Sequence, residues 1–250
     1  MKRTIITMLI IFSSIVSWGI SAKTGDITVS LGYAQLHAPG LKKFVKDANI
    51  SGSNYFDEAL SAKLDDDEYD ATMFSGSDGK YKDPKGFNIK YRYEVTDNLG
   101  VIGAFTWAHF TTNGHVNANL DYVDPYTSIV STGEASGKGT VKSNYWSFLV
   151  GPTLRANEYV SLYGMLGVAL SEVSADATLS GKVTRTPSGK DTTAQGSDSF
   201  SYSKRKTNLA WSVGAQINPW ANVAVDLAYE GSGSGDWRTS GVTAGIGLKF

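Results

Sequence analysis

The sequence predicts an all-β fold: an eight-stranded antiparallel transmembrane β-barrel with long extracellular loops and short periplasmic turns. Its last stretch, Thr239–Phe250, alternates apolar with small or polar residues and ends on an aromatic residue, as a strand between lipid and lumen does. Long and short connections alternate along the chain, as in barrels with short periplasmic turns. The 27 Gly, 13 Tyr, 10 Phe and 6 Trp favour aromatic girdles over an average globular composition. A soluble sandwich ending on an edge strand is the alternative.

The N-terminus has the pattern of a secretory signal peptide. Two basic residues precede an apolar run, Ile5–Val16, and small residues lead to a cleavage point after Ala22, as in exported proteins. The apolar run is shorter than the ~20 residues that a membrane-spanning helix needs. We therefore expect a signal peptide over residues 1–22 and an outer-membrane barrel domain over residues 23–250. The mildly acidic remainder disfavours nucleic-acid binding, and the chain has no cysteine.

Eight segments show the period-two alternation of half-buried strands. The most informative is Phe87–Val95, where aromatic and aliphatic residues occupy one face and Asn, Lys, Arg and Glu the other, a pattern that needs a polar interior. The mean hydropathy of -0.18 is compatible with a barrel because only alternate residues face lipid. In order, the segments are Asp26–Leu36, Phe87–Val95, Leu99–Phe110, Tyr145–Arg155, Tyr159–Ser171, Leu209–Ile217, Val223–Glu230 and Thr239–Phe250.

The connections between these segments define two ends of the barrel. The first outer connection, His37–Lys85, has no sustained period and is predicted to be a loop. Alternation continues into Glu172–Lys206 with shifted parity, which predicts strands that extend beyond the membrane, a bulge near Ser171 and an exposed sheet edge open to β-augmentation. The other outer connections are Thr111–Lys142 and Gly231–Arg238, and the short turns are Thr96–Asn98, Ala156–Glu158 and Asn218–Asn222.

Charged residues of both signs share the parity of the predicted lumen. An eight-stranded barrel is just filled by its inward side chains, so we expect these charges to neutralise each other and keep the barrel rigid. A path for protons or ions is the alternative, which is less favoured because buried charges demand partners. The residues are Lys90, Arg92, Glu94, Arg155, Asp226, Glu230 and Lys249.

The outer loops hold the candidate contact residues. Aromatic residues are interleaved with charges in the first two loops, as in protein-contact surfaces, although the rings could instead pack together and hold the loops up. Lys204, Arg205 and Lys206 fall where the sixth strand enters the membrane and are candidates for lipopolysaccharide phosphates, with snorkelling to the interface as the alternative. The aromatic candidates are Tyr55, Phe56, Tyr69, Phe74, Tyr81, Tyr122 and Tyr126.

Catalytic and metal-binding patterns are weak. The three histidines form no H-E-x-x-H motif, and no G-x-S-x-G motif occurs, so neither a metalloprotease nor a hydrolase elbow is indicated. The acidic run Asp65–Asp70 lacks the central glycine of a calcium loop. We therefore expect that the protein is not an enzyme, that it has no catalytic residues and that it binds no metal or cofactor.

Several strand motifs resemble those of the Ail/Lom/OmpX outer-membrane proteins. These motifs are Gly86–Glu94, Leu99–Thr106, Gly151-Pro152, Asn218-Pro219 and the C-terminal Gly245–Phe250. The resemblance implies an eight-stranded barrel in the bacterial outer membrane that acts in adhesion, invasion, serum resistance or phage-encoded surface change. The expected partners are outer-membrane lipid and lipopolysaccharide, together with host-cell, matrix or serum proteins bound by the loops of a monomer. A barrel enzyme acting on envelope lipid or protein, or a purely structural envelope protein, are the alternatives.

Overall fold

The computed structural model describes residues 24–49, 70–123, 129–186 and 190–250, with side chains omitted for 70–74 and 120–123. Within these ranges the chain is built almost entirely of strands, with one α-helix over residues 39–49 and a 3-10 turn, η2, at Gly235–Trp237. Among the described helices, none is long and apolar enough to cross a membrane. The strands are β1 Ile27–His37, β2 Asp70–Ser77, β3 Lys85–Glu94, β4 Leu99–Val123, β5 Val130–Arg155, β6 Val160–Thr186, β7 Thr192–Trp220, β8 Val223–Ser232 and β9 Thr239–Lys249.

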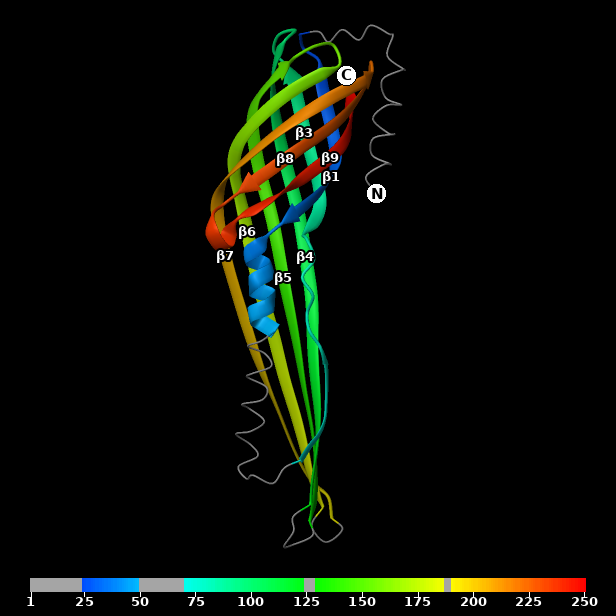
Figure 1. Ribbon diagram of the computed structural model, residues 1–250, viewed down its shortest axis with the longest axis vertical. Coiled ribbons are helices and arrows are strands. Elements are labelled where there is room, and N and C mark those ends of the chain that lie inside the picture. Colours follow the sequence, from blue (N-terminus) through cyan, green and yellow to red (C-terminus); the bar gives the residue numbers. More distant parts are fainter. Residues whose placement is uncertain (1–23, 50–69, 124–128, 187–189) are drawn as a thin grey trace.

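Eight strands form a closed antiparallel ring, which confirms the predicted barrel. Each of β3 to β8 pairs with the next strand in the chain, and β1 pairs with both β3 and β9. The closing pair aligns Leu31 with Ile246. The short turns lie at the end of the barrel where the C-terminus also lies (Figure 1). One of them is held by Asn157, whose Oδ1 accepts the backbone N–H of Val160 at 2.8 Å.

The alternation of residue types gives the ring an apolar outside and a polar inside. Outward side chains such as Leu166 and Leu209 are 72% and 84% exposed, so that a bilayer can cover them. Inward positions such as Thr106 and Ser147 are fully buried. The outer belt is aromatic where β3, β4 and β5 adjoin, with the Phe105 and Phe148 ring centroids 4.9 Å apart.

Strands β4 to β7 continue far beyond the barrel. Figure 1 shows these four strands running past the ends of β8 and β9 as a narrow, twisted sheet. The β4–β5 pairing runs from Leu99↔Leu154 to Val123↔Val130 without a register shift. The predicted loop Thr111–Lys142 is therefore largely a hairpin, because its small and polar residues still pair in register. The predicted extension of the strands through Glu172–Lys206 is present in β6 and β7.

The segment His37–Lys85, predicted to be a loop without regular structure, contains the helix of residues 39–49 and β2. Proline at position 39 suits the first turn of a helix, and apolar residues at Leu41, Phe44, Val45 and Ala48 follow the helical period. The prediction was wrong because this helix is short and its period covers only two turns. Strand β2 pairs with the outer part of β4, from Asp70↔Asp121 to Ser77↔His115.

The predicted bulge near Ser171 is absent. Strand β6 stays in register with β5 at Tyr145↔Ser171 and with β7 at Ser171↔Lys206 and Val173↔Lys204. The change of parity has another cause: Val173 and Ala175 face inward and pack against the apolar cluster formed by the helix. Along β6, the apolar residues are therefore on the outer face where lipid covers the strand and on the inner face where the helix packs against it.

We predict that Val150→Arg impairs insertion by ~2 to 4 kcal/mol, because an arginine near the bilayer midplane must leave water. Val150 is 58% exposed on the outer face of β5. The measurement is urea unfolding in lipid vesicles, followed by the heat-dependent shift on detergent gels. Val150→Leu is the matched control and should fold as the wild type does. An equal loss in both variants would mean that this face does not meet lipid.

Candidate functional site

An ion-pair layer crosses the middle of the barrel. Lys90 of β3 forms a buried ion pair with Asp226 of β8. The Tyr163 hydroxyl accepts a hydrogen bond from Lys90 Nζ at 2.9 Å and donates to Asp226 Oδ2 at 2.8 Å. Thr243 of β9 accepts a further bond from Lys90 at 3.1 Å. Four strands are therefore joined across the lumen by one lysine and one aspartate.

A second layer lies toward the end with the short turns. Glu94 pairs with Arg92 on its own strand and with Arg155 of β5, whose Nη2 lies 2.8 Å from Glu94 Oε1. Arg92 also donates to Gln216 Oε1 at 2.7 Å. At the rim of this end, Lys249 Nζ lies 2.8 Å from Asp26 Oδ2.

Glu230 belongs to a third layer, toward the extracellular mouth. Its two carboxylate oxygens accept hydrogen bonds from the hydroxyls of Tyr145 and Thr106, each at 2.8 Å. Tyr145 and Tyr163 have the same inward parity as the charges, but the predicted network was limited to charged residues and did not include their hydroxyls. The structure thus places all seven predicted charges on the inner side, in several layers.

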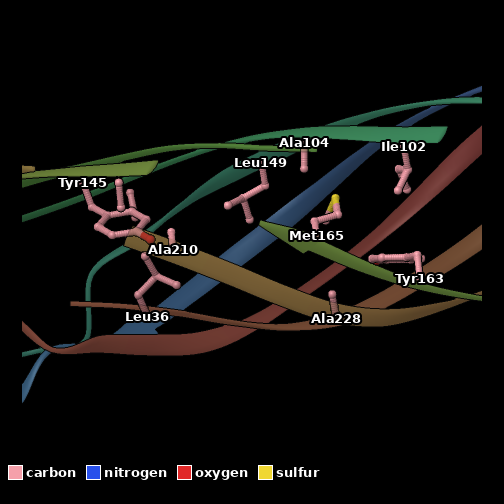
Figure 2. Close-up of a cluster of buried hydrophobic side chains, with 11 residues drawn as sticks. Leu36, Ile102, Ala104, Tyr145, Leu149, Tyr163, Met165, Ala210 and Ala228 are labelled. Atoms are coloured by element: carbon pink, nitrogen blue, oxygen red, sulfur yellow. The ribbon is translucent and has the colours of Figure 1, made fainter. Parts of the chain in front are cut away.

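Apolar side chains fill the space between these layers. Figure 2 shows Tyr145 and Leu149 of β5, Met165 of β6 and Leu36 of β1 projecting into the interior. Ile102 at 1% exposure and Met165 at 2% are packed as in a soluble core. Ion pairs and apolar side chains together fill the interior, so the barrel acts as a rigid support for the extracellular strands.

The helix of residues 39–49 follows β1 at the extracellular mouth and runs outward along the extended strands (Figure 1). Its apolar face, with Leu41 and Val45, packs against Phe110 and Val141 of β4 and β5. Gly40 makes a close approach possible, because a Cβ there would lie 1.7 Å from the backbone oxygen of Asp236. The cavity beneath the helix has a volume of about 30 Å³, on the order of one or two water molecules. The mouth is closed by packing.

Both ends of this helix are tied to the strands. The Ala38 N–H donates to the Tyr81 hydroxyl at 3.0 Å, and that hydroxyl donates to Asp83 Oδ1 at 3.1 Å. His37 Nδ1 lies 2.9 Å from the same oxygen. At the other end, Asn49 Nδ2 donates to the Gly79 carbonyl at 2.9 Å. Burial raises the pKa of Tyr81 to about 12, so its hydroxyl remains neutral and able to donate.

The structure describes only some of the predicted loop contact residues. Tyr81 is half-buried and packs on Phe110, with ring centroids 5.6 Å apart, so it holds the mouth together. Phe74 and Tyr122 lie in β2 and β4, but their side chains are outside the described part of the structure. Outside the described residues altogether are Tyr55, Phe56, Tyr69 and Tyr126.

The basic triplet of β7 does not present one common face. Arg205 has outward parity and its Nε lies 2.8 Å from Glu172 Oε1. The Nζ atoms of Lys204 and Lys206 instead lie 5.9 and 6.0 Å from the centre of the Trp237 ring, over the loop between β8 and β9. Only the arginine therefore projects toward the surrounding outer leaflet.

Among the described strands, the extracellular sheet has an unpaired edge along β7. Pairing with β8 begins at Ala210↔Ser232, and the Gly233 N–H donates to the Leu209 carbonyl at 3.2 Å. Beyond that point, β7 pairs with β6 as far as Thr192↔Arg185, and the described residues supply no strand on its other side. Since backbone direction alternates along a strand, odd-numbered residues from Leu209 back to Thr193 direct N–H and C=O toward this edge. The exposed edge was predicted within Glu172–Lys206; its first part, Val173–Leu179, belongs to β6 and is paired on both sides.

We predict that Asp226→Asn destabilises the barrel by ~3 to 5 kcal/mol, because it leaves the Lys90 ammonium buried without its counter-ion. The double variant Lys90→Met/Asp226→Leu should lose less than the single variant, since both charges are gone. Urea unfolding of the refolded protein in lipid vesicles measures both. Equal losses from the single and double variants would show that the pairing is not what stabilises this layer.

We predict that acid loosens the helix of residues 39–49. The hydrogen bond from His37 is the main cause that holds the pKa of Asp83 below its ordinary value of 3.8. The carboxylate therefore contributes fully above about pH 3.8, and its contribution is lost as the pH falls through the lowered pKa. Hydrogen exchange of residues 39–49, corrected for intrinsic rates, should show protection that decreases in this acidic range. Asp83→Asn should show weaker protection that no longer changes there, and a wild-type-like profile would contradict the role of Asp83.

Comparison with known proteins identifies the family. Residues 58–250 match the model of the enterobacterial Ail/Lom protein. The outer membrane protein lom of Escherichia phage lambda is 41% identical over 178 residues, 70% of this chain and 78% of the relative. The attachment invasion locus protein of Yersinia enterocolitica is 30% identical over 251 residues and the full length of both chains. The crystal structure of Ail from Yersinia pestis with the heparin analogue sucrose octasulfate has a TM-score of 0.48 and 26% identity, covering 91% of this chain and 99% of that one. The chain therefore belongs to the enterobacterial Ail/Lom family and is a protein of the bacterial outer membrane.

Proposed function

We propose that this protein attaches the bacterial surface to host macromolecules through its extracellular sheet, acting as a monomer and not as an enzyme. The name of the Yersinia enterocolitica relative, an attachment invasion locus protein, supports attachment. The observation that carries the proposal is the unpaired edge of β7, because an edge of this kind accepts a strand from another protein through backbone hydrogen bonds. Such binding tolerates varied partner sequences.

The composition of the edge suits this role. Residues whose backbone faces the edge include Ser197, Ser199, Ser201 and Ser203, whose small side chains leave room for an added strand. Edge strands are ordinarily protected by charges, proline or bulges. Between Thr192 and Thr207, the β6–β7 register shows no bulge. The opposite side of the extracellular sheet is different, because β2 pairs there with β4.

The monomer and the absence of catalysis rest on separate observations. The barrel closes on itself through β1–β9 and β4–β5, so no second chain is needed to complete it. The three histidines are held at three separate places, by Asp83, by Asn144 and by Ser77. This dispersal argues against a shared catalytic centre and disfavours the alternative of a barrel enzyme.

Contact with lipopolysaccharide is the second part of the proposal. A row of outward residues crosses the sheet just above the aromatic belt, where Lys85 pairs with His109, His109 with Asn144, and Glu172 with Arg205. Lys85 and Arg205 at the two ends of this row are placed to meet lipid phosphates at the leaflet surface. Lys204 and Lys206 are not part of this contact because they lie over Trp237.

We predict that Ser201→Pro strongly reduces attachment to cultured host cells or matrix, while Ser201→Ala does not. Proline removes an N–H that faces the free edge and leaves the bonds to β6 in place. Alanine removes only the hydroxyl and keeps the edge. Attachment is measured with bacteria that carry equal amounts of each variant on the surface, verified by heat-modifiable migration. If both variants attach as well as the wild type, the edge of β7 is not the attachment surface.

A further inference from the structure

The extracellular sheet carries a polar furrow on its outer face. It crosses β4, β5, β6 and β7 and has a volume of about 660 Å³. None of its lining residues belongs to the lumenal layers, to the basic triplet or to the helix of residues 39–49. Neither attachment through the β7 edge nor contact with lipid phosphates accounts for it.

The register of the four strands explains its shape. One wall is a cross-strand row in which Asn117 pairs with Ser136, Ser136 with Ser180, and Ser180 with Ser197. The other wall pairs Asn119 with Glu134, Glu134 with Lys182, and Lys182 with Gln195. Between the walls runs the row Ala135, Gly181 and Gly196, whose parity is opposite to that of the walls, so this row turns its backbone toward the furrow. The floor is therefore backbone.

The side chains of both walls have outward parity. On β4 the even-numbered residues, such as Thr106 and Ala118, are buried on the inner face, so Asn117 and Asn119 face outward. The same counting from buried Ser147 and Ser161 places the wall residues of β5 and β6 on this side. The furrow thus lies on the face that meets lipid further down the strands, and it opens sideways over the membrane.

The chemistry of the walls selects a class of ligand. They present serine hydroxyls and Asn and Gln carboxamides, which donate and accept hydrogen bonds, and they contain no aliphatic or aromatic group that could anchor a protein partner. Glu134 and Lys182 contribute one charge of each sign, so the furrow does not select a polyanion. A neutral chain rich in hydroxyl groups fits these walls.

Most of this hydrogen-bonding capacity is unused within the described part of the chain. The Ser136 and Ser180 hydroxyls bond to each other at 2.7 Å. The amides of Asn117, Asn119 and Gln195 make no side-chain hydrogen bond to another described residue. They are exposed, so water satisfies them and a hydroxyl-rich ligand can replace that water without leaving a buried polar group unpaired.

The height of the furrow indicates the source of the ligand. Asn117 follows Trp107 of the aromatic belt on the same strand, roughly 30 Å further out at ~3.3 Å per residue. A surface that opens sideways at this height faces the carbohydrate that stands on the outer leaflet of the same cell. We propose that the furrow binds a neutral oligosaccharide segment of the bacterium's own surface polysaccharide, running across the four strands.

The test uses the full-length protein refolded in lipid nanodiscs. The probe is a neutral oligosaccharide prepared from the lipopolysaccharide of an enteric bacterium and freed of phosphate and of acidic sugars, and binding is followed by titration calorimetry at low and high salt. We expect saturable binding that salt does not weaken, because the ligand is uncharged. Ser180→Ile/Ser197→Ile should weaken it by about tenfold, the loss expected for two hydrogen bonds.

Thr178→Ile is the matched control, since Thr178 pairs with Lys138 one row outside the furrow and has the same outward parity. It should bind as the wild type does, and hydrogen exchange of β6 and β7 verifies that all variants keep the sheet. No saturable binding to the wild type, or equal binding by the Ser180→Ile/Ser197→Ile variant, would overturn the proposal. Binding to neutral host-type N-glycans but not to the bacterial oligosaccharide would also overturn it, because the assignment to the cell's own surface would be wrong.

Discussion

Closure of the hydrogen-bonded ring is the constraint on which the rest of this structure depends. Inside a bilayer each unpaired N–H or C=O costs several kcal/mol, so a sheet can cross only when its first and last strands meet. The pairing of β1 with β9 satisfies this condition. It also explains the alternation of every strand, because a closed ring has one face in lipid and one face that eight strands fill with side chains. The ion pairs, hydroxyls and apolar groups of the lumen follow from that geometry.

Outside the membrane the same strands are released from this constraint. Water can satisfy an exposed backbone group, so beyond the end of β8 the described part of β7 is paired with β6 on one side alone. The inner face also changes character, because the helix of residues 39–49 replaces the lumen and packs on Val173 and Ala175. One continuous sheet therefore has three environments along its length: a barrel wall, the seat of the mouth helix and a free extracellular surface.

The sequence predicted those parts of the fold that lipid imposes. Alternation of apolar and polar residues identified all eight strands, and the parity of Lys90 and Asp226 placed them in the lumen before their pairing was known. The polar hairpin of β4 and β5 was missed because, without lipid, small and polar residues such as those between Thr111 and Lys142 leave no two-residue period to read. The position of the free edge could not be predicted either, because it depends on where β8 ends, and the sequence of β7 contains no signal for the end of β8.

The length of the extracellular strands determines what can meet the protein. From Trp107 to Val123, β4 extends by roughly 50 Å at ~3.3 Å per residue, and its pairing with β5 remains in register to that point. A barrel ending at the aromatic belt would be screened by the carbohydrate around it. This sheet is a spacer built from backbone hydrogen bonds, and it carries the outer ends of β4 to β7 out through a layer that excludes large molecules from the membrane surface.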